Sequence, residues 1–174
     1  MKKLFTVISE RMPEFLRSPE ERGVTLVETL VAIAISVLVF SVLSTALVQF
    51  VLTTRWGNNQ LQVTSDIQVA SLWLGRDALE AASFTPGAGS VYGTLDWADG
   101  SQQFRYTYDS TAGALIREHF DAGVLQSRTT IARHILNQPD VSFLITGQLL
   151  TVSITSTSGA EAETANLAFA LRAR

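Results

Sequence analysis

The chain has 174 residues, a net charge of −3 and no cysteine, so disulfide bonds take no part in its fold. Five of its thirteen basic and four of its sixteen acidic residues precede Gly23, which leaves eight basic and twelve acidic residues in the remainder. That remainder lacks the basic surface that binds a phosphate backbone, so we expect no contact with nucleic acid.

A long apolar segment lies near the N-terminus. Residues 29–54 form a run of 26 residues without a charge, and about 20 such residues are enough for a helix to cross a bilayer. Every Lys or Arg before this run lies within residues 1–22, and Arg55 follows it. By the positive-inside rule, this asymmetry predicts a cytoplasmic N-terminus and an external C-terminal part. We therefore predict a single-pass helix of the cytoplasmic (inner) membrane over residues 24–55.

One carboxylate, that of Glu28, stands near the start of this helix. A charged side chain at the centre of a bilayer costs roughly 2.5 kcal/mol or more unless it finds a partner. In the headgroup zone the cost is small. Glu28 is therefore explained either by an interfacial position or by a positively charged partner within the apolar layer.

The residues around Glu28 form a recognisable motif. Residues 23–28, Gly-Val-Thr-Leu-Val-Glu, follow a short basic leader and open the charge-free helix. This arrangement resembles the processing site of type IV prepilins and pseudopilins. The resemblance implies that a prepilin peptidase cuts between Gly23 and Val24, removes the leader 1–23 and methylates the new N-terminus at Val24. Two features differ from many family members: Val24 replaces the more usual Phe, and the leader is longer.

The resemblance also implies assembly into a filament, and its physical basis is simple. Cleavage creates an α-amino cation at Val24, and in a filament this cation is buried in the same apolar layer as Glu28 of a neighbouring subunit. Pairing offsets much of the cost of burying the two charges, and it fixes the axial register. The implied partners are the prepilin peptidase, other pilins or pseudopilins through the N-terminal helix, the inner-membrane assembly platform, and membrane lipid before assembly.

The helix is expected to continue beyond the membrane. Trp56 beside Arg55 suits the outer interface, and residues 56–59 are a possible kink. Over residues 56–83 the apolar side chains recur at spacings of three and four, which predicts an amphipathic half that lays one face on a folded domain. The stripe comprises Val63, Ile67, Ala70, Leu74, Ala78 and Ala81, whereas Asp66, Arg76, Asp77 and Glu80 fall off it.

Two features favour a minor pilin or pseudopilin over a major pilin. No Gly or Pro interrupts residues 24–55, whereas the best-known major pilins carry both in the middle of this helix. Residues 66–77 also look like the second half of the helix in minor pilins and pseudopilins of the W/J type.

Residues 84–174 are predicted to form an antiparallel β-sheet domain. Residues 83–93, rich in Gly and Pro, are predicted to form a loop. Runs that alternate with a period of two then predict strands over 102–108, 114–120, 124–128, 141–145, 149–155 and 166–171, with a short strand or helical turn over 131–135. The predicted turns are Asp99-Gly100, Ala122-Gly123, Gly147-Gln148 and Ser158-Gly159. No crossover helices separate the strands, so the sheet is antiparallel and the fold class is α+β, a long N-terminal helix packed on a sheet.

The remaining residues give little indication of catalysis. The two histidines, His119 and His134, fit no metal-ligand spacing or triad, and we expect them at the surface or at a sheet edge. Asp96, Asp99 and Ser101 offer oxygen atoms of the kind that calcium prefers, but a plain turn at residues 99–100 explains them better.

The aromatic residues of one predicted strand, Phe104, Tyr106 and Tyr108, fit core packing against the helix better than stacking on bases. We therefore expect no enzymatic activity, no metal and no cofactor.

Two interpretations remain. The first is a structural subunit, a minor pilin or pseudopilin of a type IV pilus, type II secretion or competence filament. The second is a signal-anchored extracytoplasmic enzyme or binding domain that keeps its N-terminus. Loss of residues 1–23 and methylation of Val24 distinguish the two.

Overall fold

A computed structural model describes residues 24–172. The predicted leader, including Gly23 of the cleavage site, lies outside the described residues. The chain divides into two units, one ending at Val48 and the other beginning at Gln49. Helix α1 (Leu26–Glu80) contributes to both units, and the strands belong to the second.

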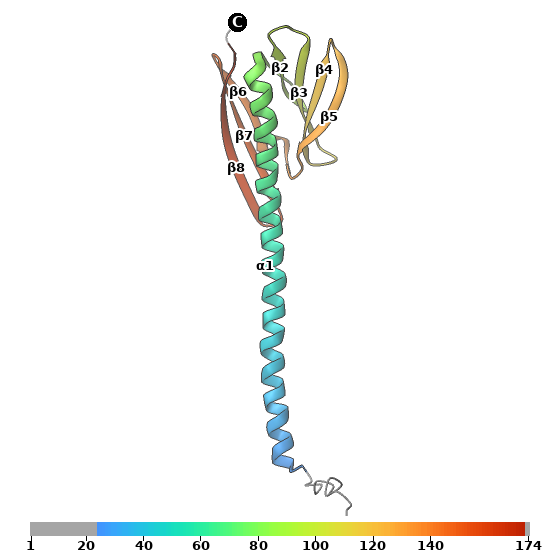
Figure 1. The fold of residues 1–174 in the computed structure, drawn as a ribbon, viewed down its shortest axis with the longest axis vertical. Helices are drawn as coiled ribbons and strands as arrows, with labels where there is room; N and C mark the ends of the chain where they lie inside the picture. The colour runs from blue at the N-terminus through green and yellow to red at the C-terminus, as the bar shows by residue number, and fades with distance from the viewer. Residues whose placement is uncertain (1–23, 173–174) are drawn as a thin grey trace, which may run out of the picture. The chain divides into compact units, whose positions relative to one another are not determined.

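The second unit contains two antiparallel sheets where the sequence predicted one (Figure 1). The first sheet has the order β1 (Ala81–Pro86), β2 (Val91–Trp97), β3 (Gln102–Asp109), β4 (Ala114–Asp121) and β5 (Val124–Ala132). After the short 3-10 helix η2 (Gln138–Asp140), the second sheet has the order β6 (Val141–Thr146), β7 (Leu149–Ser158) and β8 (Glu161–Ala170). All neighbouring strands are antiparallel, which confirms the predicted α+β class.

The predicted loop over residues 83–93 is shorter in the structure. Residues 83–86 belong to β1 and residues 91–93 to β2, these two strands pair, and only residues 87–90 form the connection between them. Pro86 pairs with Gly93 at the end of β1, an edge strand, where the missing N–H of proline is tolerated. The ring of Phe84 lies over Gly93. Only glycine leaves room for this ring, because a Cβ at position 93 would lie 2.3 Å from it. The Pro and Gly that indicated a loop are thus compatible with a sheet edge.

Smaller differences concern the ends of elements. Residues 131–135, considered as a separate strand or helical turn, begin as the end of β5, which runs to Ala132. Strand β8 begins at Glu161, five residues earlier than predicted. The possible kink at residues 56–59 does not interrupt the hydrogen-bonded helix.

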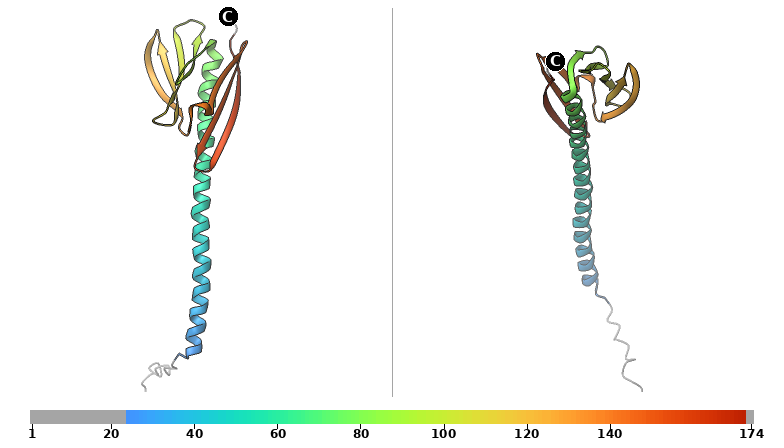
Figure 2. Two further views of the ribbon diagram at one scale, coloured as in Figure 1. Left: turned by 180° about the vertical axis from the view of Figure 1, so that it is seen from behind. Right: turned by 45° about the horizontal axis from the view of Figure 1, so that its top comes forward.

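A single core joins the second half of α1 to both sheets, which flank the helix in Figures 1 and 2. Every residue of the predicted apolar stripe is buried, which confirms the amphipathic pattern from Val63 to Ala78. Ala81 is buried as the first residue of β1, because α1 ends at Glu80 and not at the predicted residue 83. The sheets also touch each other, because the ring of Phe143 on β6 stacks on Phe84 of β1, with 5.7 Å between ring centres. Phe104 and Tyr106 are buried in the same core, as predicted.

The turn between β7 and β8 docks on α1. Ser158 Oγ donates a hydrogen bond to Gln62 Oε1 at 2.6 Å and lies 3.4 Å from Asn59 Oδ1. Gly159 has a φ of +61°, and a Cβ at this position would lie 2.3 Å from Asn59 Nδ2. The polar residues near position 59 therefore hold the hairpin against the helix.

Candidate processing and assembly site

Thr25 caps the start of α1. Its Oγ1 accepts a hydrogen bond from the backbone N–H of Glu28 at 3.2 Å, and its carbonyl accepts one from the N–H of Thr29 at 3.1 Å. Thr at the N-cap with Glu three residues later is the spacing of a capping box, and a carboxylate in the first turn is stabilised by the helix dipole. Residues 25–28 therefore also encode the start of the helix.

Of the two residues that the implied assembly requires, Val24 lies two residues before α1 and Glu28 lies in its first turn. Both are exposed, Val24 to 72 %. The side chains of Val24 and Glu28 are therefore both accessible to other molecules.

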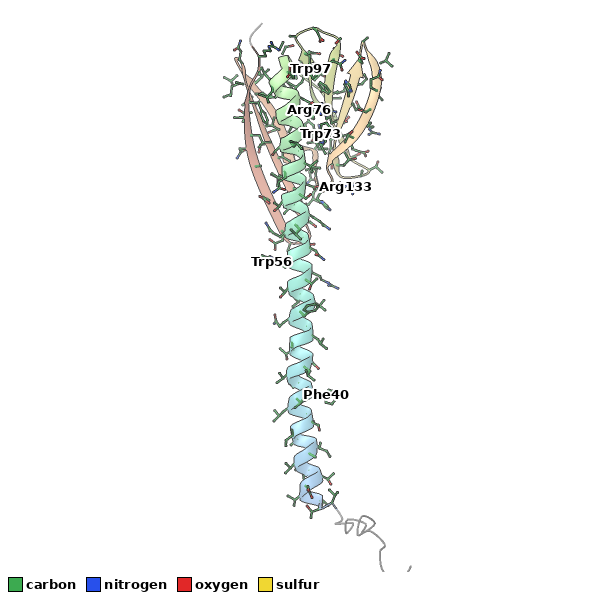
Figure 3. The ribbon with its side chains drawn as sticks, in the orientation of Figure 1. Phe40, Trp56, Trp73, Arg76, Trp97 and Arg133 are labelled. Atoms are coloured by element: carbon green, nitrogen blue, oxygen red, sulfur yellow. The ribbon has the colours of Figure 1, made fainter. Side chains whose placement is uncertain are left out.

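The part of α1 that belongs to the first unit, up to Val48, exposes its apolar side chains all around the helix. Phe40, labelled in Figure 3, is 70 % exposed. Its most apolar stretch of 18 residues has a mean hydropathy of 2.6, and none of these residues is buried inside the protein. Removing one large apolar side chain fully from water is favourable by about 1.5–3 kcal/mol. By length and composition this helix could cross a membrane, and its exposed apolar side chains suit contact with lipid or with other helices.

The hydroxyl groups along this helix bond back to their own backbone. Ser36 Oγ donates to the carbonyl of Ala32 at 2.7 Å, and Thr45 Oγ1 donates to the carbonyl of Ser41 at 3.0 Å. Such bonds satisfy a hydroxyl group without any partner molecule. These residues are therefore compatible with apolar surroundings.

The position of Glu28 fits an interface. The 20 residues from 29 to 48 carry no charge and extend about 30 Å at 1.5 Å per residue, the thickness of a bilayer's hydrocarbon core. When these residues fill the hydrocarbon core, Glu28 lies at its edge, where a carboxylate costs little free energy.

Two acidic residues of α1 that were predicted off the apolar stripe, Asp66 and Asp77, are in fact buried, to 9 % and 1 % exposure. They are eleven residues apart, about three turns, so both flank the same side of the stripe. The buried face of α1 is therefore wider than one apolar stripe and includes polar positions with dedicated partners.

Asp77 forms a buried bidentate ion pair with Arg117 of β4. Arg117 Nε donates to Oδ2 at 2.6 Å and Nη2 donates to Oδ1 at 2.7 Å, while the hydroxyl of Tyr106 donates to Oδ2 at 2.5 Å. The guanidinium lies 4.5 Å from the ring centre of Trp73 and 4.3 Å from that of Phe104. This cluster fastens α1 to the first sheet.

The environment of this cluster shifts two pKa values. Burial, together with the negative charge of Asp77, raises the pKa of Tyr106 well above its usual value. Burial lowers the pKa of Arg117, but its hydrogen bonds to Asp77 and the charge of Asp77 outweigh this and raise it. The cluster therefore holds a protonated tyrosine and a charged arginine.

Asp66 connects α1 to both sheets. Its Oδ2 accepts hydrogen bonds from the backbone N–H groups of Arg133 and His134, at 3.0 and 2.9 Å, and from Ser156 Oγ of β7 at 3.1 Å. Nδ1 of His134 lies 2.8 Å from the same oxygen. This histidine, expected at the surface or a sheet edge, is half-buried directly after β5 in a structural contact.

The other polar candidates also make local structural contacts. His119 stacks on Phe104, with 4.8 Å between ring centres, and its Nε2 contacts the side-chain oxygen of Gln102. Both carboxylate oxygens of Asp99 bond to Ser101, and these bonds lower the pKa of Asp99. Residues 99–100 form the predicted turn. Within residues 24–172, no group of three or more His, Asp or Glu side chains is placed to hold a metal ion.

Comparison with known proteins identifies the N-terminal segment. Residues 19–47 match the family model of the prokaryotic N-terminal methylation motif, and the match includes Gly23, Val24 and Glu28. Neither curated proteins nor solved structures give a match. The chain thus carries a cleavage and methylation motif of the type IV prepilin kind at the head of a membrane-capable helix.

Proposed function

We propose that this protein is a minor pilin or pseudopilin, a structural and not a catalytic subunit of a type IV pilus, type II secretion or competence filament. One observation supports the proposal: the methylation motif, which includes Val24 and Glu28, lies at the head of a helix whose apolar side chains are exposed up to Val48. A helix of this kind is suited to lipid before assembly and to neighbouring helices afterwards.

The ion pair between subunits supplies the register. The amine of Val24 and the carboxylate of Glu28 each carry a large desolvation cost in an apolar layer, and pairing between adjacent subunits offsets much of it. A slip by one helical turn separates the charges by about 5 Å. The pair therefore selects one axial arrangement of neighbouring helices.

The part of α1 that belongs to the second unit also has a row of exposed apolar side chains that could contact other helices. Leu61, Leu72 and Leu79 are about 70 % exposed, at 70, 71 and 71 %. Their spacings of eleven and seven residues are close to three and two turns, so they share one side of the helix, opposite the buried stripe. Exposed leucines aligned in this way support helix packing between subunits beyond the membrane segment.

The proposal predicts the chemical state of the mature N-terminus. Mass spectrometry of the protein from membranes should show a chain that begins at Val24, lacks residues 1–23 and carries one N-terminal methyl group. An intact leader would contradict the proposal and favour a signal-anchored enzyme or binding domain.

Processing should depend on Gly23. Gly23→Leu should lower the cleaved fraction at least tenfold, because the peptidase must approach the backbone closely at this residue and a side chain prevents that approach. Val24→Phe, which introduces the residue more usual in the family, is the matched control and should be cleaved like the unmodified chain. Normal cleavage of Gly23→Leu, measured as the ratio of long to short chain on immunoblots, would contradict the assignment.

A further inference from the structure

The outward-facing residues of the second sheet include no charged side chain. Alternation along the strands places three of these residues on β6, five on β7 and five on β8. Their cross-strand register brings them together on one face. This surface, called the hydroxyl face below, comprises Ser142, Leu144, Thr146, Leu149, Thr151, Ser153, Thr155, Thr157, Ala162, Thr164, Asn166, Ala168 and Ala170.

The sequence keeps charge away from this face by alternation. The two acidic residues of β8, Glu161 and Glu163, occupy the opposite side of the strand, where Oε2 of Glu163 accepts a hydrogen bond from Thr64 of α1 at 2.8 Å. The first sheet differs, because it carries ion pairs of Glu118 with Arg105 at 3.9 Å and with Arg128 at 3.7 Å. Protein surfaces are usually rich in charge, and depletion of charge marks the centre of interfaces.

We propose that the hydroxyl face docks on the same face of a second copy of this chain. A hydroxyl group both donates and accepts hydrogen bonds, so a surface of Ser and Thr is complementary to itself. The hydroxyls of Thr155 and Thr164, 2.9 Å apart, already pair across two strands in this way. Copies without the leader carry eight basic and twelve acidic residues and therefore repel each other, and a charge-free face is where they approach at the least electrostatic cost.

The size of the face indicates when this contact forms. Each outward residue of a sheet covers about 33 Å², from strand spacing and rise, so the face offers about 400 Å² per copy. A standard stable interface buries about 800 Å² per partner. The inference therefore rests on the proposed function, since the membrane helix must first bring copies together and raise their effective concentration.

Thiol cross-linking tests the proposal with little background, because the chain has no cysteine. Ser153→Cys places a thiol at the centre of the hydroxyl face, and Thr130→Cys places one on β5 at an exposed position of the other sheet. With the full chain in cell membranes and a short bifunctional thiol reagent, Ser153→Cys should give at least tenfold more product of twice the chain mass. Equal yields from the two variants, or a product with the mass of a different protein, would overturn the proposal.

A charge in the face should abolish the contact. Asn166→Cys, whose residue pairs with Ser153 across the strands, should also cross-link, and addition of Ser153→Lys should lower its yield at least tenfold by placing like charges opposite each other. Thermal unfolding should be unchanged, and an undiminished yield would overturn the proposal.

Mass spectrometry of the N-terminus in the same samples separates this inference from the proposed function. A methylated Val24 without the Ser153→Cys product overturns only the contact. The product together with an intact leader overturns only the proposed processing.

Discussion

Glu28→Ala is expected to remove this protein from the filament while leaving its cleavage intact. In the proposed assembly, the α-amino group of Val24 is buried opposite the Glu28 carboxylate of a neighbour. Removing one member of a buried ion pair costs about 3–5 kcal/mol because the other charge stays unpaired. The incorporated fraction should therefore fall at least a hundredfold.

The measurement is the fraction of the protein that copurifies with sheared filaments, set against the total cleaved protein in the cell. Glu80→Ala is the matched control, since Glu80 is an exposed glutamate of the same helix and should be dispensable for incorporation. Glu28→Gln keeps the shape and removes the charge, and it should behave like Glu28→Ala. Normal incorporation of Glu28→Ala would mean that charge pairing does not register the subunits.

The sequence predicted those elements whose evidence is local. The period of three to four from Val63 to Ala78 matched the buried face of α1, and the period of two, with turns such as Ala122-Gly123, located most strands after residue 100. The β1–β2 hairpin was missed because Pro86 and Gly93 indicate a loop unless the covering ring of Phe84 is known. The division into two sheets was missed because local patterns do not state which strands pair.

In the functional site and around it, too, local features were predicted and long-range contacts were missed. Residues 23–28 were identified from a contiguous motif, and the family model includes them. The burial of Asp77 was missed because its partner Arg117 lies 40 residues away, and a carboxylate beside an apolar stripe ordinarily faces water. Long-range ion pairs of this kind leave no trace in local periodicity.

Asp77→Ala should be among the most destabilising single substitutions in the second unit. It leaves the guanidinium of Arg117 buried against Trp73 and Phe104 without a counter-charge, and it removes the acceptor of the Tyr106 hydroxyl. A loss of about 3–5 kcal/mol in the free energy of unfolding is expected, a large part of the roughly 5–15 kcal/mol typical of a folded domain. Urea unfolding of the detergent-solubilised chain, followed by tryptophan fluorescence, measures it.

Two comparison variants identify the cause of that loss. Arg105→Ala removes the exposed pair with Glu118, whose atoms are 3.9 Å apart, and should cost less than about 1 kcal/mol because water screens such pairs. The double variant Asp77→Leu/Arg117→Met removes both buried charges at once. It should be more stable than Asp77→Ala, since no unpaired charge remains in the core. If the double variant were as unstable as the sum of its single substitutions, the loss would come from packing and the ion pair would not explain it.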